Sequence, residues 1–132
     1  MTNVIIVGGN DETRMLLRGL MRLHRFRVVL EGSTLDCLLR IPTPSDGGIL
    51  LMDVDIREEA WARAISEALR AHPSVRAVLL TPSKAGGVEE RAKAIGIHAT
   101  LRRPFAVHEL IEAVGGPARE PPRGPDGEPG RV

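Results

Sequence analysis

The chain alternates between short runs of apolar residues and longer stretches in which apolar residues recur at every third or fourth position. A continuous apolar run bounded by turn residues is typical of a strand buried on both faces, whereas the wider recurrence is typical of an amphipathic helix. The strands predicted in this way are residues 4–7, 27–30, 49–53, 75–80 and 97–101. The predicted helices are residues 11–24, 33–39, 58–71, 88–95 and 107–114.

This alternation of five strands with five helices predicts the fold class. Parallel neighbouring strands need a crossover connection, and a helix usually provides it, so the alternation favours a parallel sheet with helices on its faces. For a chain of 132 residues, an open doubly wound sheet is favoured over a closed barrel. The predicted class is therefore α/β, with a five-stranded parallel sheet.

The helical recurrence also predicts which side chains face the core. For the first helix, the predicted apolar face consists of Leu16, Leu17, Leu20, Met21 and Leu23. For the second, it consists of Leu35, Leu38 and Leu39, with Cys37 as a small core or boundary residue. For the third, it consists of Trp61, Ala64, Ile65, Ala68 and Leu69. For the last, it consists of Val107, Leu110, Ile111 and Val114.

The composition changes near residue 115, where the chain becomes rich in proline and glycine and poor in apolar residues. Such a segment buries too little apolar surface to offset the entropy lost on ordering. We therefore expect one folded domain over residues 1–115 and a disordered tail over residues 116–132.

Charge and cysteine content narrow the classes of partner. The net charge of +1 gives no electrostatic basis for binding nucleic acid or a membrane, and two Phe, one Trp and no Tyr offer no stacking platform for bases. A single cysteine excludes an intrachain disulfide and suits a reducing compartment. With no signal peptide and no run of ~18 apolar residues, the expected location is the cytoplasm.

Polar side chains stand at the carboxyl ends of several predicted strands. Asp53 ends the third strand, Thr81 follows the fourth, and Arg103 follows the fifth, while Gly8 and Gly9 follow the first. Ligands of open parallel sheets bind beyond the carboxyl ends of the strands. A carboxylate, a hydroxyl and a cation brought together there can bind or transfer a phosphoryl group.

Four segments in this order resemble the receiver domain of bacterial response regulators, which is the CheY-like fold. They are Val4–Val7 with Arg14, Leu50–Val54, Val78–Thr81 and Arg102–Phe105, and the resemblance covers residues 4–115. It implies a flavodoxin-like fold with strand order 2-1-3-4-5. It also implies that Asp53 is in the phospho-acceptor position, Thr81 is the hydroxyl that contacts the phosphoryl group, and Arg103 is in the position of the family's lysine.

The sequence departs from that family at three places. Gly8 and Gly9 replace the acidic pair that holds a divalent cation, Arg103 replaces the lysine, and Thr100 replaces the aromatic residue that switches rotamer on phosphorylation. Magnesium prefers carboxylate ligands, so we expect no bound magnesium and no other cofactor. Together the departures predict an atypical receiver that no longer runs the usual phosphorylation cycle.

The resulting hypothesis is a stand-alone receiver in two-component (phosphorelay) signalling that is not an enzyme and acts by protein–protein interaction. Its expected partner is a histidine kinase or an output protein, and a homodimer is expected on the face formed by the fourth helix, fifth strand and fifth helix.

Two alternatives stay open. Asp53 could be phosphorylated, with Asp11 or Asp55 supplying the missing metal ligand, although Asp11 is expected in the first helical turn and Asp55 in an exposed loop. Alternatively, the Gly8–Gly9 turn could form a small-anion or nucleotide site with Thr81 and Arg103. The simpler interpretation of the two glycines is a tight turn.

Overall fold

The computed structural model describes residues 2–41, 48–82 and 86–115. The five strands are β1 (Asn3–Gly8), β2 (Arg27–Gly32), β3 (Gly48–Asp53), β4 (Val75–Thr81) and β5 (Ala99–Arg102). The five helices are α1 (Asp11–Leu23), α2 (Asp36–Leu39), α3 (Glu59–Ala71), α4 (Val88–Ala94) and α5 (Val107–Gly115). The predicted tail, residues 116–132, lies outside the described residues. No helix of the described part is long and apolar enough to cross a membrane.

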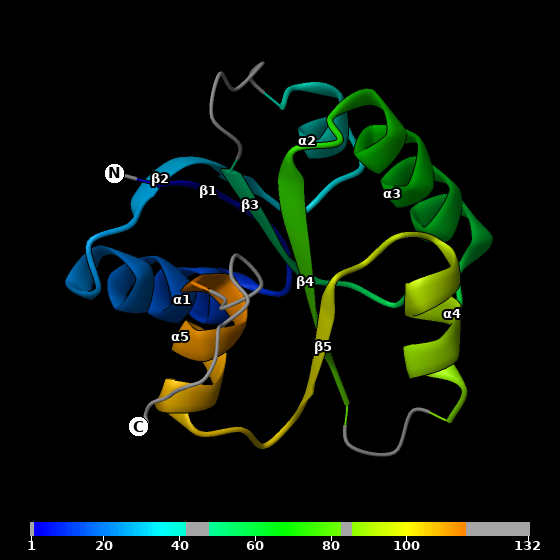
Figure 1. The fold of residues 1–132 in the computed structure, drawn as a ribbon. Helices are drawn as coiled ribbons and strands as arrows, with labels where there is room; N and C mark the ends of the chain where they lie inside the picture. Colours follow the sequence, from blue (N-terminus) through cyan, green and yellow to red (C-terminus); the bar gives the residue numbers. More distant parts are fainter. Residues whose placement is uncertain (1, 42–47, 83–85, 116–132) are drawn as a thin grey trace, which may run out of the picture.

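The strands form one parallel sheet in the order β2-β1-β3-β4-β5, which confirms the predicted fold class and strand order (Figure 1). Gly8 at the end of β1 is in register with Asp53 at the end of β3. Thr81 at the end of β4 is in register with Arg102. The carboxyl ends of four neighbouring strands therefore meet along one edge of the sheet.

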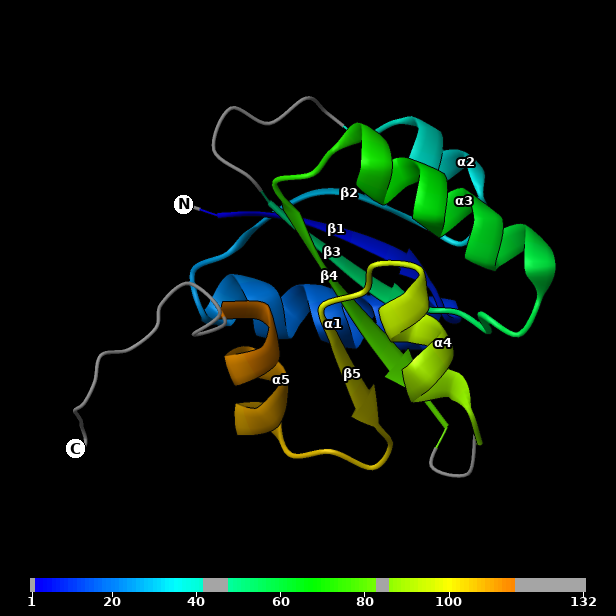
Figure 2. The ribbon, with the colours of Figure 1, turned by 45° about the vertical axis from the view of Figure 1, so that its right-hand side comes forward.

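Helices cover both faces of the sheet (Figures 1 and 2). On one face, α1 and α5 cover a core that includes Ile6 and Leu51. On the other face, α2, α3 and α4 cover a core that includes Ile5 and Leu50. Neighbouring residues of one strand point to opposite faces, so both must be apolar, which explains the continuous apolar runs in the sequence.

The apolar face of α1 is narrower than the sequence suggested. Leu17 and Met21 are buried, but Leu16 and Leu23 are 63% and 73% exposed, so the prediction that these two face the core was wrong. A helix turns by about 100° per residue, which places both of them on a different side from Leu17 and Met21. Leu16 and Leu23 project into solvent beside the core rather than into it.

The second helix was predicted too long. β2 runs on to Gly32, and α2 contains four residues only, because the chain turns tightly where the strand ends. A side chain at Gly32 would come within 2.4 Å of the Cys37 sulfur, so the two segments pack closely only with glycine there. Cys37 and Leu38 are buried as expected, but Leu35 and Leu39 are 36% and 83% exposed, so the prediction that these two face the core was wrong.

The other predicted elements agree with the structure within two residues. Trp61, Ala64 and Leu69 pack against the core on one side of α3, as predicted. Leu110 and Val114 of α5 are fully buried, whereas Val107 is 47% exposed because it lies at the first residue of the helix. β5 begins at Ala99, two residues later than expected.

Candidate functional site at the carboxyl edge of the sheet

Asp53 and Arg103 form a bidentate ion pair at the end of β3. The Arg103 Nη1 donates to Asp53 Oδ1 at 3.0 Å, and Arg103 Nη2 donates to Asp53 Oδ2 at 2.6 Å. The Asp53 side chain is 17% exposed, so both of its oxygens are engaged in a largely buried place. The hydrogen bonds from Arg103 to this carboxylate raise the pKa of the Arg103 guanidinium. Arg103 is therefore a permanent cation beside the carboxylate.

The Gly8–Gly9 turn passes directly over Asp53. Both glycines have positive φ, +91° and +72°, and the Gly9 N–H donates to the Asp53 carbonyl oxygen at 3.0 Å. A Cβ at Gly8 would lie 2.4 Å from that carbonyl oxygen and 2.5 Å from Val54 Cγ1. A Cβ at Gly9 would lie 2.9 Å from Asp53 Oδ2. A side chain at Gly8 would therefore require the backbone at Asp53 to shift, and one at Gly9 would require the Asp53 carboxylate and the Thr13 side chain to move. The positive φ values add strain for any residue other than glycine.

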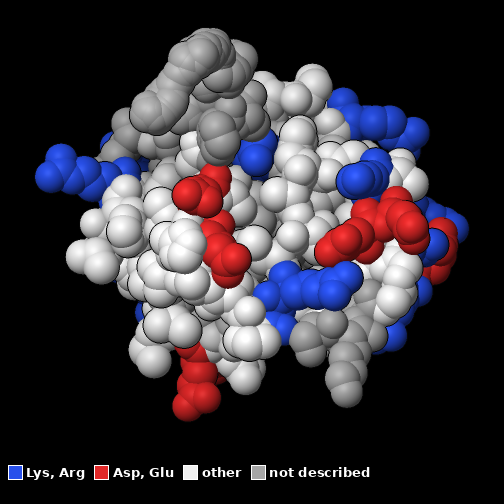
Figure 3. Space-filling view, turned by 60° about the horizontal axis from the view of Figure 1, so that its bottom comes forward, with Lys and Arg blue, Asp and Glu red and all other residues white. Residues whose placement is uncertain are grey.

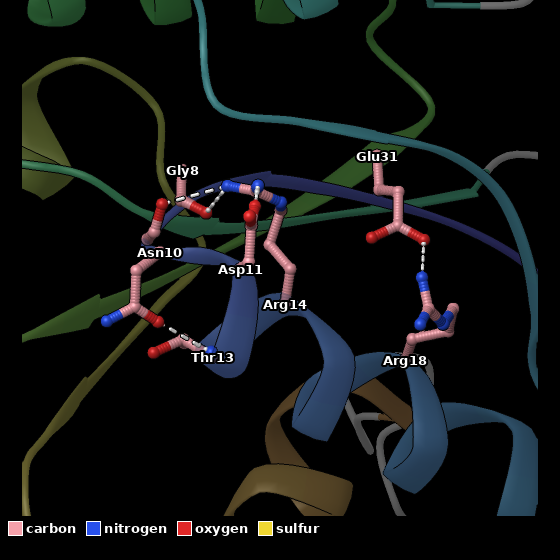
Figure 4. A network of polar contacts seen from close by, with 8 residues as sticks. Gly8, Asn10, Asp11, Thr13, Arg14, Arg18 and Glu31 are labelled. Atoms are coloured by element: carbon pink, nitrogen blue, oxygen red, sulfur yellow. Dashed lines mark hydrogen bonds and ion pairs between the residues drawn. The ribbon is translucent and has the colours of Figure 1, made fainter.

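Arg14 holds this turn from the first helix (Figure 4). Its Nη1 donates to the carbonyl oxygens of Gly8 and Gly9, at 3.3 and 2.8 Å, and its Nη2 pairs with Asp11. The Asn10 side chain caps α1 by accepting from the Thr13 N–H at 2.7 Å. Arg14 belongs to one of the four segments that resemble receiver domains, but its contact with the turn could not be predicted, because that turn becomes visible only in three dimensions.

Thr81 lies beside Asp53 in a hollow of about 170 Å³, which is also lined by Arg57, Ile56 and Val88. Its side chain is almost fully buried, at 4% exposed. Among the described residues, no hydrogen bond is made by the Thr81 hydroxyl. The structure thus brings Asp53, Thr81 and Arg103 to the same edge, as the strand order predicted.

The two other acidic candidates are engaged elsewhere. Asp55 forms a bidentate pair with Arg57, at 2.9 and 3.0 Å, and these hydrogen bonds lower the pKa of the Asp55 carboxyl. Asp11 is 96% exposed and pairs with Arg14 at the start of α1. Neither carboxylate joins Asp53.

A divalent cation does not fit these donors. Arg103 occupies both oxygens of Asp53, and Arg14 occupies the carbonyl oxygens of the Gly8–Gly9 turn. Within residues 2–41, 48–82 and 86–115, no group of three or more His, Cys, Asp or Glu side chains could hold a metal. A hard cation requires several such oxygen ligands, so the residues present do not match a magnesium site.

Thr100 lies apart from this cluster. It is half-buried in the middle of β5, in register with Leu79, and its neighbours Ala99 and Leu101 pack on the α1 and α5 side of the sheet. The alternation along the strand turns Thr100 toward the side of α4.

Arg91 of α4 is a second residue that the sequence did not reveal. Its Nε donates to the Ile56 carbonyl oxygen at 2.8 Å, and its Nη2 pairs with Glu59 at 3.0 Å. Arg91 thereby ties α4 to the loop that follows Asp53.

No protein-family model and no curated protein match the chain, but many solved structures do. A LuxR-family DNA-binding response regulator from Staphylococcus aureus matches with a TM-score of 0.72 at 20% identity, over 87% of this chain and 97% of that one. A response regulator from Burkholderia pseudomallei with a phosphorylated aspartic acid, a calcium ion and citrate matches with a TM-score of 0.70 at 16% identity. The match covers 89% of this chain and 69% of that one. A putative pilus assembly-related protein from Burkholderia pseudomallei K96243 matches with a TM-score of 0.73 at 22% identity, over 87% of each chain.

These likenesses establish the fold. The chain has the five-stranded, flavodoxin-like fold of response regulator receiver domains, as the resemblance of its four segments implied. Identities of 16% to 22% establish nothing finer, and the matches include proteins described in different terms. The roles of Asp53, Thr81, Arg103, Gly9 and Thr100 stay predictions, and so does an anion at the Gly8–Gly9 turn.

Proposed function

We propose that this protein is a two-component signalling module of the receiver class that acts by binding a protein partner and is not switched by magnesium-dependent phosphorylation. The observation that carries the proposal is the bidentate pair between Asp53 and Arg103. A carboxylate accepts a phosphoryl group only when one oxygen is free to attack and the charge of the incoming group is screened by a cation. Here the guanidinium engages both oxygens.

The glycine turn supports the same conclusion independently. The acidic pair of the family is replaced by two residues whose backbone has positive φ and whose Cβ positions overlap the chain around Asp53. The turn is therefore committed to a different geometry, and its carbonyl oxygens are bound by Arg14. In this proposal, two arginines take the place of a metal ion and hold the site in one state.

The surface expected to bind the partner is formed by α4, β5 and α5, by analogy with the receiver fold. Arg102 of β5 pairs with Glu89 of α4 at 3.3 Å, and Arg91 ties α4 to the loop after Asp53. These contacts link α4 to β5 and to the loop after Asp53 without a phosphoryl group. The partner is a histidine kinase or an output protein, and the same face is the one predicted for a homodimer.

One observation favours phosphorylation of Asp53 as the alternative. The Thr81 hydroxyl is buried beside Asp53, lines a hollow of about 170 Å³ and has no hydrogen-bonding partner among the described residues. Such a hydroxyl could donate to a phosphoryl oxygen if Arg103 moved away from the carboxylate.

Titration of the full chain with Mg²⁺ and beryllofluoride, followed by ¹H–¹⁵N NMR, separates the two functions. We expect no saturable shifts for the amides of Asp53, Thr81 and Arg103 at ~10 mM Mg²⁺, because the site lacks the ligands for the metal. Asp53→Asn serves as the matched control, since it removes the acceptor with little change in shape. Saturable shifts in the natural chain that disappear in Asp53→Asn would overturn the proposal in favour of phosphorylation.

A further inference from the structure

The solvent-facing side of α1 carries large apolar side chains that nothing in the described chain covers. Met15, Leu16 and Leu23 are 58%, 63% and 73% exposed. They lie on the helix away from the buried Leu17 and Met21. Scattered exposed leucines are ordinary, but three on one face of a 13-residue helix form an apolar strip.

Charged residues are unevenly distributed over the surface around this strip. In Figure 3, uncharged side chains cover much of the lower left of the molecule, the side on which α1 and α5 lie in Figure 1, whereas charges crowd the opposite side. The surface on this side thus carries few charges, in a protein whose charged residues amount to 27%. Exposed apolar side chains on a surface with few charges are typical of a protein interface.

Gly19 lies in the middle of the same strip, between Leu16 and Leu23. A Cβ added to Gly19 would meet no atom within 4 Å, and its φ is not positive, so the fold does not require glycine there. Glycine in a helix interior is less favourable than alanine. A glycine without a role inside the molecule is explained if another helix approaches closely at this point.

The two ends of the strip carry opposite charges. Asp11 and Glu12 are exposed at the start of α1, and Arg22 is exposed in its last turn. Neither Glu12 nor Arg22 forms an ion pair with any residue in the described ranges. An antiparallel copy of the same helix would place the acidic end of each against the basic end of the other.

From these observations we infer that α1 pairs with α1 of a second copy of this chain, antiparallel about a two-fold axis. An axis halfway between Leu17 and Arg18 places Leu16 of each copy over Gly19 of the other. The same axis places Glu12 opposite Leu23 of the second copy, beside its Arg22. The interface is self-complementary in shape and in charge, as a two-fold interface must be.

The pairing is concentration-dependent rather than permanent. A helix of 13 residues is about 20 Å long, so a helix pair buries less than the ~800 Å² per partner of a typical stable interface. It is independent of the function proposed for Asp53, and it leaves the face formed by α4, β5 and α5 free for a signalling partner. The homodimer predicted on that face is an alternative to this pairing, and charge reversal on α1 and on α4 distinguishes the two.

Sedimentation velocity of the full chain between about 5 and about 500 µM tests the pairing. We expect the mass to rise from one chain to two across this range, and Leu16→Glu to abolish the rise. Gly19→Met is the sharper variant, because methionine favours helix and adds apolar surface but fills the space needed by Leu16 of the other copy. For Gly19→Met, the inference requires weaker association together with a higher melting temperature. Stronger association would show that the apolar surface is unspecific and would overturn the inference.

Charge reversal tests the antiparallel arrangement. Glu12→Arg and Arg22→Glu should each raise the dissociation constant about tenfold, and the two changes in one chain should restore it, because each new charge then meets its opposite. Glu89→Arg on α4 is the matched control and should have no effect. A chain that stays monomeric throughout, or whose association responds to Glu89→Arg and not to the α1 variants, would refute the inference. Circular dichroism of every variant verifies folding.

Discussion

The ion pair between Asp53 and Arg103 can be measured by a double-mutant cycle. The variants are Asp53→Asn, which keeps the shape of the side chain, Arg103→Gln, which removes the charge with a shorter polar side chain, and their combination. Two unit charges about 4 Å apart at an effective dielectric of ~20 attract by about 4 kcal/mol. Desolvation and the ordering of the arginine offset part of this attraction. With Asp53 17% and Arg103 37% exposed, we expect a net coupling of about 1–3 kcal/mol.

Urea unfolding monitored by tryptophan fluorescence provides the assay, because Trp61 is the chain's single tryptophan and packs against the core. The matched control is the neighbouring pair of Asp55 and Arg57, which is also bidentate, through Nε and Nη2 of Arg57, but has side chains 40% and 60% exposed. For that pair we expect a weaker coupling, reduced further by salt, because both side chains are exposed to solvent.

The single variants carry information as well. Arg103→Gln should lower the free energy of unfolding more in the natural chain than in the Asp53→Asn variant. In the natural chain it leaves the largely buried Asp53 carboxylate without its cation. If the two changes add within about 0.3 kcal/mol, the guanidinium does not bind the carboxylate in solution. The proposal that Arg103 replaces the metal ion would then lose its main support.

Two further predictions concern the turn and the sheet edge. Gly8→Ala should lower the free energy of unfolding by about 2–5 kcal/mol, because of the positive φ and the overlap with the Asp53 carbonyl oxygen. The control is Gly86→Ala, whose Cβ meets no atom and which should change the free energy of unfolding by less than ~0.5 kcal/mol. Equal losses of stability in urea unfolding would contradict this prediction. His98 Nδ1 accepts from the Ala77 N–H at 2.9 Å, and burial, then the charge of a nearby arginine, lowers the His98 pKa. The unfolded chain therefore binds the proton more readily, so stability is full above pH 6.5 and falls as the pH falls below it, by a small amount because His98 is only partly buried. His98→Gln should flatten that slope, and an unchanged slope would rule out this origin.

The sequence alone determined the fold and the identity of the edge residues. Runs such as Ile49–Met52 are apolar at every position because both faces of a parallel strand are covered, and that pattern is local. The carboxyl-end rule, with the strand order implied by the resemblance to receiver domains, then predicted that Asp53, Thr81 and Arg103 lie together. The strands and helices follow from periodicity, which a sequence contains in full, whereas the strand order follows from that resemblance.

Only the tertiary structure decided what Asp53 touches and what α1 leaves uncovered. The contact between Asp53 and Arg103 joins residues far apart in the chain. Whether the Arg103 guanidinium reaches Asp53 depends on the path of the loop after β5. The positive φ of Gly8 and the space taken by Val54 are likewise properties of the folded backbone. The exposure of Leu16 depends on how far α1 is rotated against the sheet, because a side chain's burial depends on its neighbours in space and not on its own polarity.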